Sequence, residues 1–279
     1  MPNDLQDTLN AIATMWDHWA PPLRPNIEDT TILEDSLGVW SSDGYAPVDG
    51  YAQAVLLGVT PEIATMNFPT PTNLLAIDKS EAMIQYVWPG DIPNQRTAVH
   101  GDWFNYYIVN RSKDIVLADG SLVFFNPEGV SRLVTRVSLA LDNNGIFLTR
   151  CFVMPERRET VTTILHDVHD GYSDGYHINF HEFKFRVAMA LQRSFEEGVS
   201  QDDVWKAVQM ILKASPHNGF SPADVATIDV YRGKTAKHHF PTVSELTAIL
   251  NTRFSAVTVV KPTYQFGECC QTFIAQAPR

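Results

Sequence analysis

The stretch from residue 54 to residue 62 combines the residue types that a ligand-binding turn requires. Apolar residues up to Leu57 predict a buried strand, and Pro61 is typical of the first helical position, where an N–H would be unpaired anyway. Thr60 before it is a natural helix cap. Gly58 lets a ligand approach the backbone closely. Because a helix start also presents N–H groups and a positive dipole end, we predict that this turn contacts a ligand.

Acidic residues follow the next three apolar runs of the chain. Asp78 comes about 20 residues after the glycine turn, and an acid at the tip of a second strand is placed to accept both hydroxyls of a ribose. Asp102 beside Trp103 suits an adenine, because the carboxylate accepts from the amino group while the indole packs on the base. Asp119 ends the fourth run, at the edge where open α/β sheets bind ligands. The alternatives are a helix cap for Asp78 and an ordinary turn with a core tryptophan at 102–103.

The elements that must position these residues alternate along the chain. Runs that are apolar on both faces predict buried parallel strands, at residues 53–57, 74–77, 97–100, 114–117 and 145–153. Helices are predicted between them, at residues 61–67, 80–86 and 128–142. Strand–helix alternation is typical of a doubly wound sheet. A helix at 242–251 and two closing strands at 256–260 and 272–275 complete the predicted core.

The chain divides into four predicted parts. Residues 1–40 form an N-terminal helical segment, with a helix around residues 5–19, and residues 41–155 form the sheet core. Residues 156–243 carry apolar stripes at helical spacing, which predict a mainly helical insertion covering one edge of the sheet. Residues 244–279 return to the core with the closing helix and strands.

Composition and charge narrow the class of partner. Of the 279 residues, 44% are hydrophobic and 19% charged, which excludes a disordered chain or a coiled coil. We expect no transmembrane helix and no signal peptide, and the three cysteines favour a reducing, cytoplasmic location. A net charge of −11 would repel nucleic acid and anionic membranes, so we interpret the basic run at 232–239 as a solvated loop. A small-molecule partner is therefore expected.

Five short motifs in order resemble those of the class I S-adenosylmethionine-dependent methyltransferases. The motifs are Leu-Gly-Val-Thr-Pro-Glu at 57–62, Ile-Asp-Lys-Ser-Glu-Ala-Met at 77–83, Gly-Asp-Trp at 101–103, Ala-Asp-Gly-Ser at 118–121 and Asn-Gly-Ile-Phe at 144–147. The resemblance covers residues 50 to 155. It implies a doubly wound, mostly parallel seven-stranded sheet, with an antiparallel closing hairpin near 254–276 that distinguishes this fold from the dinucleotide-binding one.

The resemblance also implies S-adenosylmethionine as cofactor and a set of residues that bind it. These are Gly58, Val59, Thr60 and Pro61 at the methionine part, Asp78, Lys79 and Met83 at the ribose, Gly101, Asp102 and Trp103 at the adenine, and Asp119 and Gly120 near the methyl group and the acceptor. One departure is visible, because the commonest family loop has two or three glycines and this one keeps only Gly58.

The N-terminal segment is predicted to act as a lid. Trp16 and Trp19 are three residues apart, share one helix face and would close over the cofactor to exclude water. Arg24 would pair with the methionine carboxylate. The alternatives are that both tryptophans pack in a core and that Arg24 is a surface cation.

His177 and His181 are candidate general bases for an acceptor hydroxyl, since imidazole titrates near neutral pH. Together with Asp119 they form the predicted catalytic set. The alternative is that they are solvated or merely line a pocket, and no metal site is predicted.

The predicted reaction is in-line displacement, in which an oxygen, nitrogen or carbon of a small-molecule acceptor attacks the sulfonium methyl group. The protein's main task is then to align two reactants, and the insertion at 156–243 would hold the acceptor. Two alternatives stay open, a nicotinamide-dependent oxidoreductase and a non-catalytic protein that binds the same cofactor. A homodimer is compatible with the sequence, and neither the acceptor nor the methylated atom follows from it.

Overall fold

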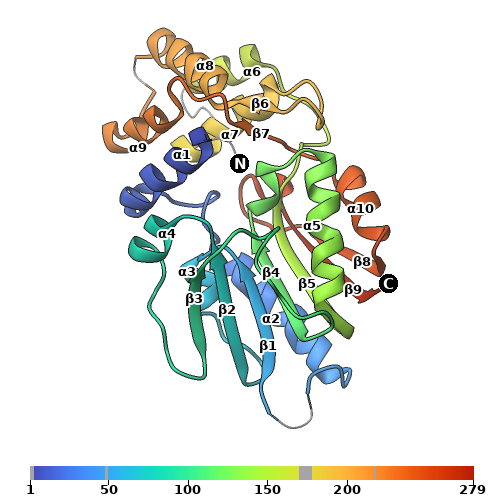
Figure 1. Ribbon diagram of the computed structural model, residues 1–279. Helices are drawn as coiled ribbons and strands as arrows, with labels where there is room; N and C mark the ends of the chain where they lie inside the picture. Colours follow the sequence, from blue (N-terminus) through green and yellow to red (C-terminus); the bar gives the residue numbers. More distant parts are fainter. Residues whose placement is uncertain (1–2, 48–49, 170–177, 217) are drawn as a thin grey trace.

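The computed structural model describes residues 3–47, 50–169, 178–216 and 218–279 (Figure 1). A seven-stranded sheet with the order β3-β2-β1-β4-β5-β9-β8 forms its centre. The strands are β1 (Ala52–Leu57), β2 (Thr72–Asp78), β3 (Arg96–His100), β4 (Lys113–Asp119), β5 (Leu141–Phe152), β8 (Phe254–Val260) and β9 (Cys270–Pro278). Strands β1 to β5 pair in parallel, whereas β9 is antiparallel to both of its neighbours, β5 and β8. The predicted mostly parallel sheet with an antiparallel closing hairpin is therefore confirmed.

Alternate side chains of the central strands enter two separate cores. Val55 and Leu57 of β1 pack against α5 (Pro127–Ala140) and α10 (Val243–Asn251), which cover one face of the sheet (Figure 1). Ala54 and Leu56 pack on the other face, against α2 (Ile27–Ser42), α3 (Pro61–Ala64) and α4 (Glu81–Tyr86). Because successive strand residues point to opposite faces, a strand covered on both sides must be apolar throughout.

The N-terminal segment divides into two parts with different partners. Helix α1 (Asn3–Thr14) and the 3₁₀ turn η1 (Trp16–His18) lie between the sheet and the insertion (Figure 1). Helix α2 instead belongs to the layer that covers the sheet, where Leu33, Leu37 and Trp40 are buried. It begins at a capping box, in which the Asn26 side chain accepts from the Asp29 N–H and the Asp29 carboxylate accepts from the Asn26 N–H. The lid hypothesis therefore concerns residues 3–19.

The insertion is mainly helical and has an apolar cluster of its own. Its elements are α6 (Val161–His169), α7 (Phe180–Leu191), β6 (Val199–Ser200), α8 (Gln201–Ala214), α9 (Pro222–Ala226), η3 (Thr227–Tyr231) and β7 (Lys237–His238). Two short 3₁₀ turns, η2 (Ser121–Phe124) and η4 (Gly267–Cys269), lie outside it. Strands β6 and β7 pair with each other away from the main sheet.

Several predicted elements differ from those observed. The helix expected at 5–19 ends at Thr14, and the one expected at 128–142 ends at Ala140 because the chain enters β5 at Leu141. The run at 232–239 is not simply a solvated loop, since His238 lies in β7 and is 3% exposed.

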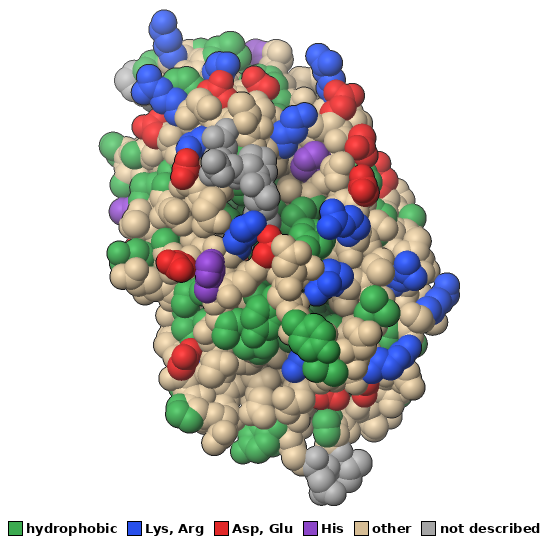
Figure 2. Space-filling view, in the orientation of Figure 1, with side chains coloured by type: hydrophobic (Ala, Val, Ile, Leu, Met, Phe, Trp, Pro, Cys, Tyr) green, Lys and Arg blue, Asp and Glu red, His purple; other side chains and the backbone are tan. Residues whose placement is uncertain are grey.

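The charged surface is mixed in sign. Lys and Arg side chains are interspersed with Asp and Glu over the upper part of the face in Figure 2. Among the described residues, no helix is both long enough and apolar enough to cross a membrane.

Candidate active site

One cavity of about 150 Å³ lies where the carboxyl ends of β1, β2 and β4 meet the turn after β3. Helix α1 and η1 cover it with Thr8, Leu9, Ile12 and Trp16, and the insertion closes its far side with Phe185, Gln201, Tyr231 and His238. Most of the predicted cofactor-binding residues line it, namely Trp19, Gly58, Val59, Thr60, Asp78, Lys79, Met83, Asp102, Trp103, Asp119 and Gly120. Arg24, Pro61 and Gly101 lie outside this lining. Residues from four strand ends thus converge as parallel strands require.

The Gly58 turn joins the ends of β1 and β2. The Gly58 N–H donates to the Ile77 carbonyl (2.9 Å), which brings the turn directly beside Asp78. Gly58 has φ +114°, and a Cβ at this position would meet no atom within 4 Å. The conformation therefore requires glycine because of its backbone angle, while the open space leaves the backbone accessible from the cavity.

Replacing Gly58 with alanine is expected to lower the free energy of unfolding by about 1–3 kcal/mol, the strain of a side chain at positive φ. Gly38 in α2 is the matched control, because it also has open space but no positive φ. Alanine there should stabilise the helix by about 0.5–1 kcal/mol. Urea unfolding of both variants measures the difference, and equal shifts would contradict the assignment of strain to Gly58.

Thr60 occupies the N-cap position of α3, but the predicted cap bond is not formed. Its hydroxyl donates instead to Asp119 Oδ2 (3.2 Å), on the strand next to β1. The predicted cap is lost because the Thr60 hydroxyl turns toward the carboxylate of Asp119 on the neighbouring strand, and a hydrogen bond to a charged acceptor is stronger than a cap to a backbone N–H.

Asp78 is buried at the tip of β2. Its Oδ1 accepts from the Ser80 N–H (2.8 Å), and its side chain borders the cavity. Ser80, not Asp78, caps α4 by accepting from the Met83 N–H, so the helix-cap alternative for Asp78 was wrong. Burial raises the pKa of Asp78 to about 6, against backbone hydrogen bonds and His100, which lower it. The carboxylate is therefore ionised at neutral pH but poorly solvated.

Asp102 and Trp103 follow β3 at the side of the cavity. Lys79 Nζ lies 2.8 Å from Asp102 Oδ2, and the Phe104 N–H donates to Oδ1. Burial raises the pKa of Asp102, but these hydrogen bonds outweigh it and lower the pKa overall. The indole of Trp103 donates to the Ile77 carbonyl (2.6 Å), which fixes the ring beside the strand tips.

Asp119 belongs to a buried charge network. Arg150, 1% exposed, donates from Nε to Asp119 Oδ1 (2.7 Å) and from its terminal nitrogens to the Pro22 and Leu23 carbonyls. A second carboxylate, Asp29, lies 3.7 Å from the guanidinium. Both oxygens of Asp119 are thus engaged, one by Arg150 and one by Thr60, which suits a fixed negative charge better than a proton acceptor.

Two predicted residues have partners other than those expected. Arg24 pairs with Glu62 (2.6 Å) and stacks over Trp16, with 5.1 Å to the ring centroid. His181 stacks on Trp19, and its Nε2 lies 2.8 Å from the His18 carbonyl. Burial, with Lys184 adding to it, lowers the pKa of His181 to about 4. His177 falls outside the described residues.

Comparison finds solved structures that resemble this chain only at low sequence identity. No protein-family model and no curated protein matches the sequence. A structure from Rhodobacter sphaeroides, described provisionally as a Zn-dependent alcohol dehydrogenase, is 13% identical and has a TM-score of 0.60, over 99% of this chain and 100% of that one. The CurJ carbon methyltransferase is 10% identical with a TM-score of 0.51, over 92% of this chain and 56% of that one. A S-adenosylmethionine-dependent methyltransferase from Thermotoga maritima is 10% identical with a TM-score of 0.49, over 97% of this chain and 98% of that one.

The position and direction of β9 decide between the two folds that share such a sheet. Dinucleotide-binding sheets have the order 3-2-1-4-5-6 in parallel, whereas here an antiparallel strand is inserted between β5 and β8. The chain has the class I methyltransferase fold. The strand order therefore identifies the fold. Because these solved structures are at most 13% identical to this chain, they support the fold and nothing about its function.

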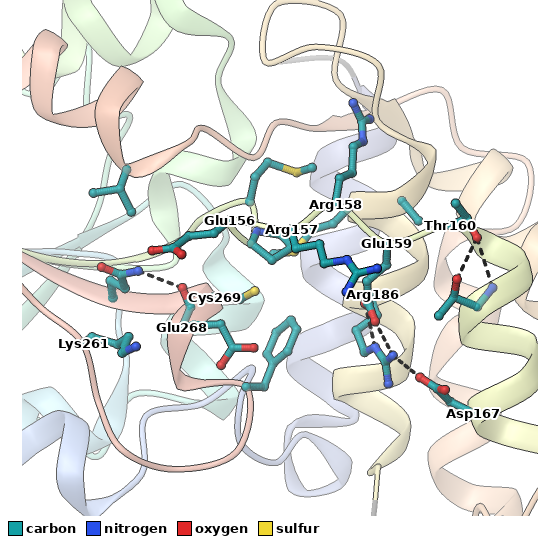
Figure 3. A pocket seen from close by; sticks show the side chains of 18 residues that line it. Glu156, Arg157, Arg158, Glu159, Thr160, Asp167, Arg186, Lys261, Glu268 and Cys269 are labelled. Atoms are coloured by element: carbon teal, nitrogen blue, oxygen red, sulfur yellow. Dashed lines mark hydrogen bonds and ion pairs between the residues drawn. The ribbon is translucent and has the colours of Figure 1, made fainter.

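The described residues hold a larger hollow outside this cavity and no metal-binding cluster. A larger hollow of about 780 Å³ lies between the insertion and the closing hairpin (Figure 3), where Arg186 forms ion pairs with Glu159 and Asp167. No residue of β1, β2, β3 or β4 lines it, so it is separate from the candidate active site. Among the described residues, no three His, Cys, Asp or Glu side chains converge as a metal site.

Sequence reasoning expected the insertion to close the site but missed the residues that form the far wall of the cavity. Gln201, Tyr231 and His238 line it, although they come from a helix start, a 3₁₀ turn and a two-residue strand. The one available signal was the pair of histidines at 238–239, at the end of a cationic run. A solvated loop has no need of imidazole side chains, so these residues could have indicated a buried position.

Proposed function

We propose that this protein transfers a methyl group from S-adenosylmethionine to a small-molecule acceptor. The observation that carries the proposal is the convergence of the Gly58 turn, Asp78, Asp102 and Asp119 on one cavity in a methyltransferase fold. The sulfonium methyl supplies an already activated electrophile, so the side chains need only bind and align the reactants.

The residues present fit this cofactor. The Asp78 carboxylate suits the two ribose hydroxyls, because a buried carboxylate with spare acceptor capacity gains from new donors. Trp103, fixed by Ile77, offers a flat surface for the base, and the open side of Gly58 admits the methionine part. Asp119, paired with Arg150, borders the cavity, where a carboxylate favours a positively charged ligand such as a sulfonium.

The cavity is closed more tightly than ligand binding requires. Its volume of about 150 Å³ is smaller than the roughly 300–1,000 Å³ of typical ligand pockets. Helix α1 forms its cover and is held by polar contacts, among them Thr8 to Gln201 (2.9 Å), Ser80 to Asn10 (2.8 Å) and Lys234 to Asp7 (3.2 Å). We infer that α1 and η1 move as a lid when reactants enter, and that closure excludes water from the reacting groups.

The geometry argues against a nicotinamide dinucleotide. Such cofactors place a pyrophosphate at the start of a long helix, but α3 has only four residues and carries Glu62 in its first turn. The carboxylate of Asp119 accepts a hydrogen bond from Thr60 in the same turn, and its negative charge would repel a phosphate there.

Calorimetric titration with S-adenosylhomocysteine and with NADH tests the proposal. We expect saturable one-to-one binding of S-adenosylhomocysteine and no comparable binding of NADH. Transfer of labelled methyl groups to a panel of metabolites then separates an enzyme from a non-catalytic binding protein. Preferential binding of NADH, or no binding of S-adenosylhomocysteine, would refute the proposed function.

A further inference from the structure

The cover and the far side of the cavity hold buried hydrogen-bond donors that have no partner among the described residues. The indole nitrogens of Trp16 and Trp19, Nδ1 of His238 and Nζ of Lys184 are all buried without a hydrogen bond among the described residues. Trp16, Trp19 and His238 line the cavity. Folded proteins pair nearly all such groups, so a cluster around one cavity indicates that a ligand supplies the acceptors.

Lys184 lies behind this wall in a cage of rings. It is fully buried, and its Nζ is 3.8 Å from the ring centroid of Trp19, 5.2 Å from Tyr231 and 6.0 Å from Phe185. All three rings line the cavity. Burial lowers the pKa of Lys184 well below its usual range, and no carboxylate in the described part of the chain offsets the effect. Since Trp19 ends the lid segment, movement of the lid would uncover this amine.

His238 presents a donor to the cavity. Thr8 donates to the amide oxygen of Gln201 (2.9 Å), which places the amide nitrogen of Gln201 3.3 Å from His238 Nε2. An amide nitrogen only donates, so His238 Nε2 accepts and the ring proton is on Nδ1. Burial, together with Lys184, lowers the pKa of His238 to about 3, which makes the imidazole a weak base.

The described residues that line the cavity therefore offer many donors and no available base. Asp119 has both oxygens engaged, Asp102 is paired with Lys79, and Asp78 lies at the ribose end. Among these lining residues, an acceptor that needs deprotonation would find no free carboxylate or imidazole base, and the amine of Lys184 lies behind the wall. An acceptor that is already an anion would satisfy the unpaired donors and require no base.

We propose that the acceptor is a small carboxylic acid, whose carboxylate binds at Lys184, His238 and the Trp19 indole and is methylated on oxygen. The inference rests on the proposed function and specifies its substrate class. An oxygen of the carboxylate attacks the methyl carbon, a C–O bond forms, and the S–C bond breaks with its electron pair moving to sulfur. The products are a methyl ester and S-adenosylhomocysteine. No proton is transferred, since the carboxylate is ionised at neutral pH.

The test uses the full chain saturated with S-adenosylhomocysteine and two matched pairs of probes, benzoate against benzamide and hexanoate against hexanamide. Calorimetry should show that the acids bind at least tenfold more tightly than the amides. In Lys184→Met this preference should disappear, while the affinity for S-adenosylhomocysteine stays within twofold. Lys206→Met, which removes an exposed lysine of α8, is the control and should keep the preference.

Product analysis completes the test. With labelled S-adenosylmethionine and a panel of carboxylic acids, the transferred methyl group should be released as methanol by alkali, as from an ester. Equal binding of acids and amides, an unchanged preference in Lys184→Met, or a methyl group that survives alkali would overturn the inference. Because S-adenosylhomocysteine binding is measured first, its absence would count against the proposed function instead. The thermal midpoint of Lys184→Met should not fall, since the substitution removes an unpaired buried amine.

Discussion

Replacing Arg150 with methionine is expected to lower the free energy of unfolding by about 3–5 kcal/mol, the cost of breaking a buried ion pair from one side. The side chains of Arg150 and Asp29 are each 1% exposed and that of Asp119 is 6% exposed. Without the guanidinium, both carboxylates would remain buried without a positive charge to balance them. The carbonyls of Pro22 and Leu23 would lose their donor, so the loop after the lid would also loosen.

Urea unfolding of Arg150→Met against the wild type measures this effect. Lys206→Met is the control, because Lys206 pairs with Asp202 on the exposed face of α8 and should contribute little. The double variant Arg150→Met/Asp119→Asn should regain part of the loss, since one stranded charge is then removed. A loss no larger than that of Lys206→Met would show that the network does not stabilise the fold.

Replacing Asp78 with asparagine is expected to weaken S-adenosylhomocysteine binding by about tenfold to a hundredfold. A hydrogen bond to a charged acceptor contributes about 1.5–3 kcal/mol, and the amide removes that charge. Asp35→Asn, at an exposed position of α2, is the matched control and should bind as the wild type does. Unchanged affinity in Asp78→Asn would contradict the ribose assignment.

The same residue should make binding and stability depend on pH in opposite directions. The pKa of Asp78 is raised to about 6 in the folded protein, so the folded state holds this proton more tightly than the unfolded chain does. Its contribution to stability is therefore fully present below pH 3.8 and is lost as the pH rises through about 6. Cofactor affinity should instead fall below pH 6, as the carboxylate loses its charge. Calorimetric titrations with S-adenosylhomocysteine from pH 5 to 8 should show this loss of affinity in the wild type and not in Asp78→Asn.

The part of the site at the strand ends follows from the local apolar pattern of the sequence. Gly58, Asp78 and Asp119 each come directly after an apolar run, and parallel strands bring their carboxyl ends to one edge of the sheet. Because that rule needs only the order of strands, the sequence was sufficient to predict which side chains meet there. Helix α2 was not predicted, although Asn26 and Asp29 have the spacing of a capping box.

The remaining contacts depend on which distant segments pack together. Arg150 reaches Pro22 across 128 residues, and Thr8 reaches Gln201 across 193. Thr60 bonds to Asp119 rather than capping its own helix, for the same reason. No periodicity in the chain records such pairings, because each side chain finds its partner only after both segments are packed.

The amino-acid sequence by itself determined the alternation of strands and helices, the two closing strands and the acids that follow the apolar runs, since these depend on local apolar pattern. The antiparallel pairing of the closing strands was implied by the family resemblance. Only the tertiary structure decided how Lys184, Gln201 and His238 meet behind the lid, and which of their hydrogen bonds stay unmet. The physical reason is that a buried polar group takes its properties from neighbours that burial brings together, whatever their distance along the chain.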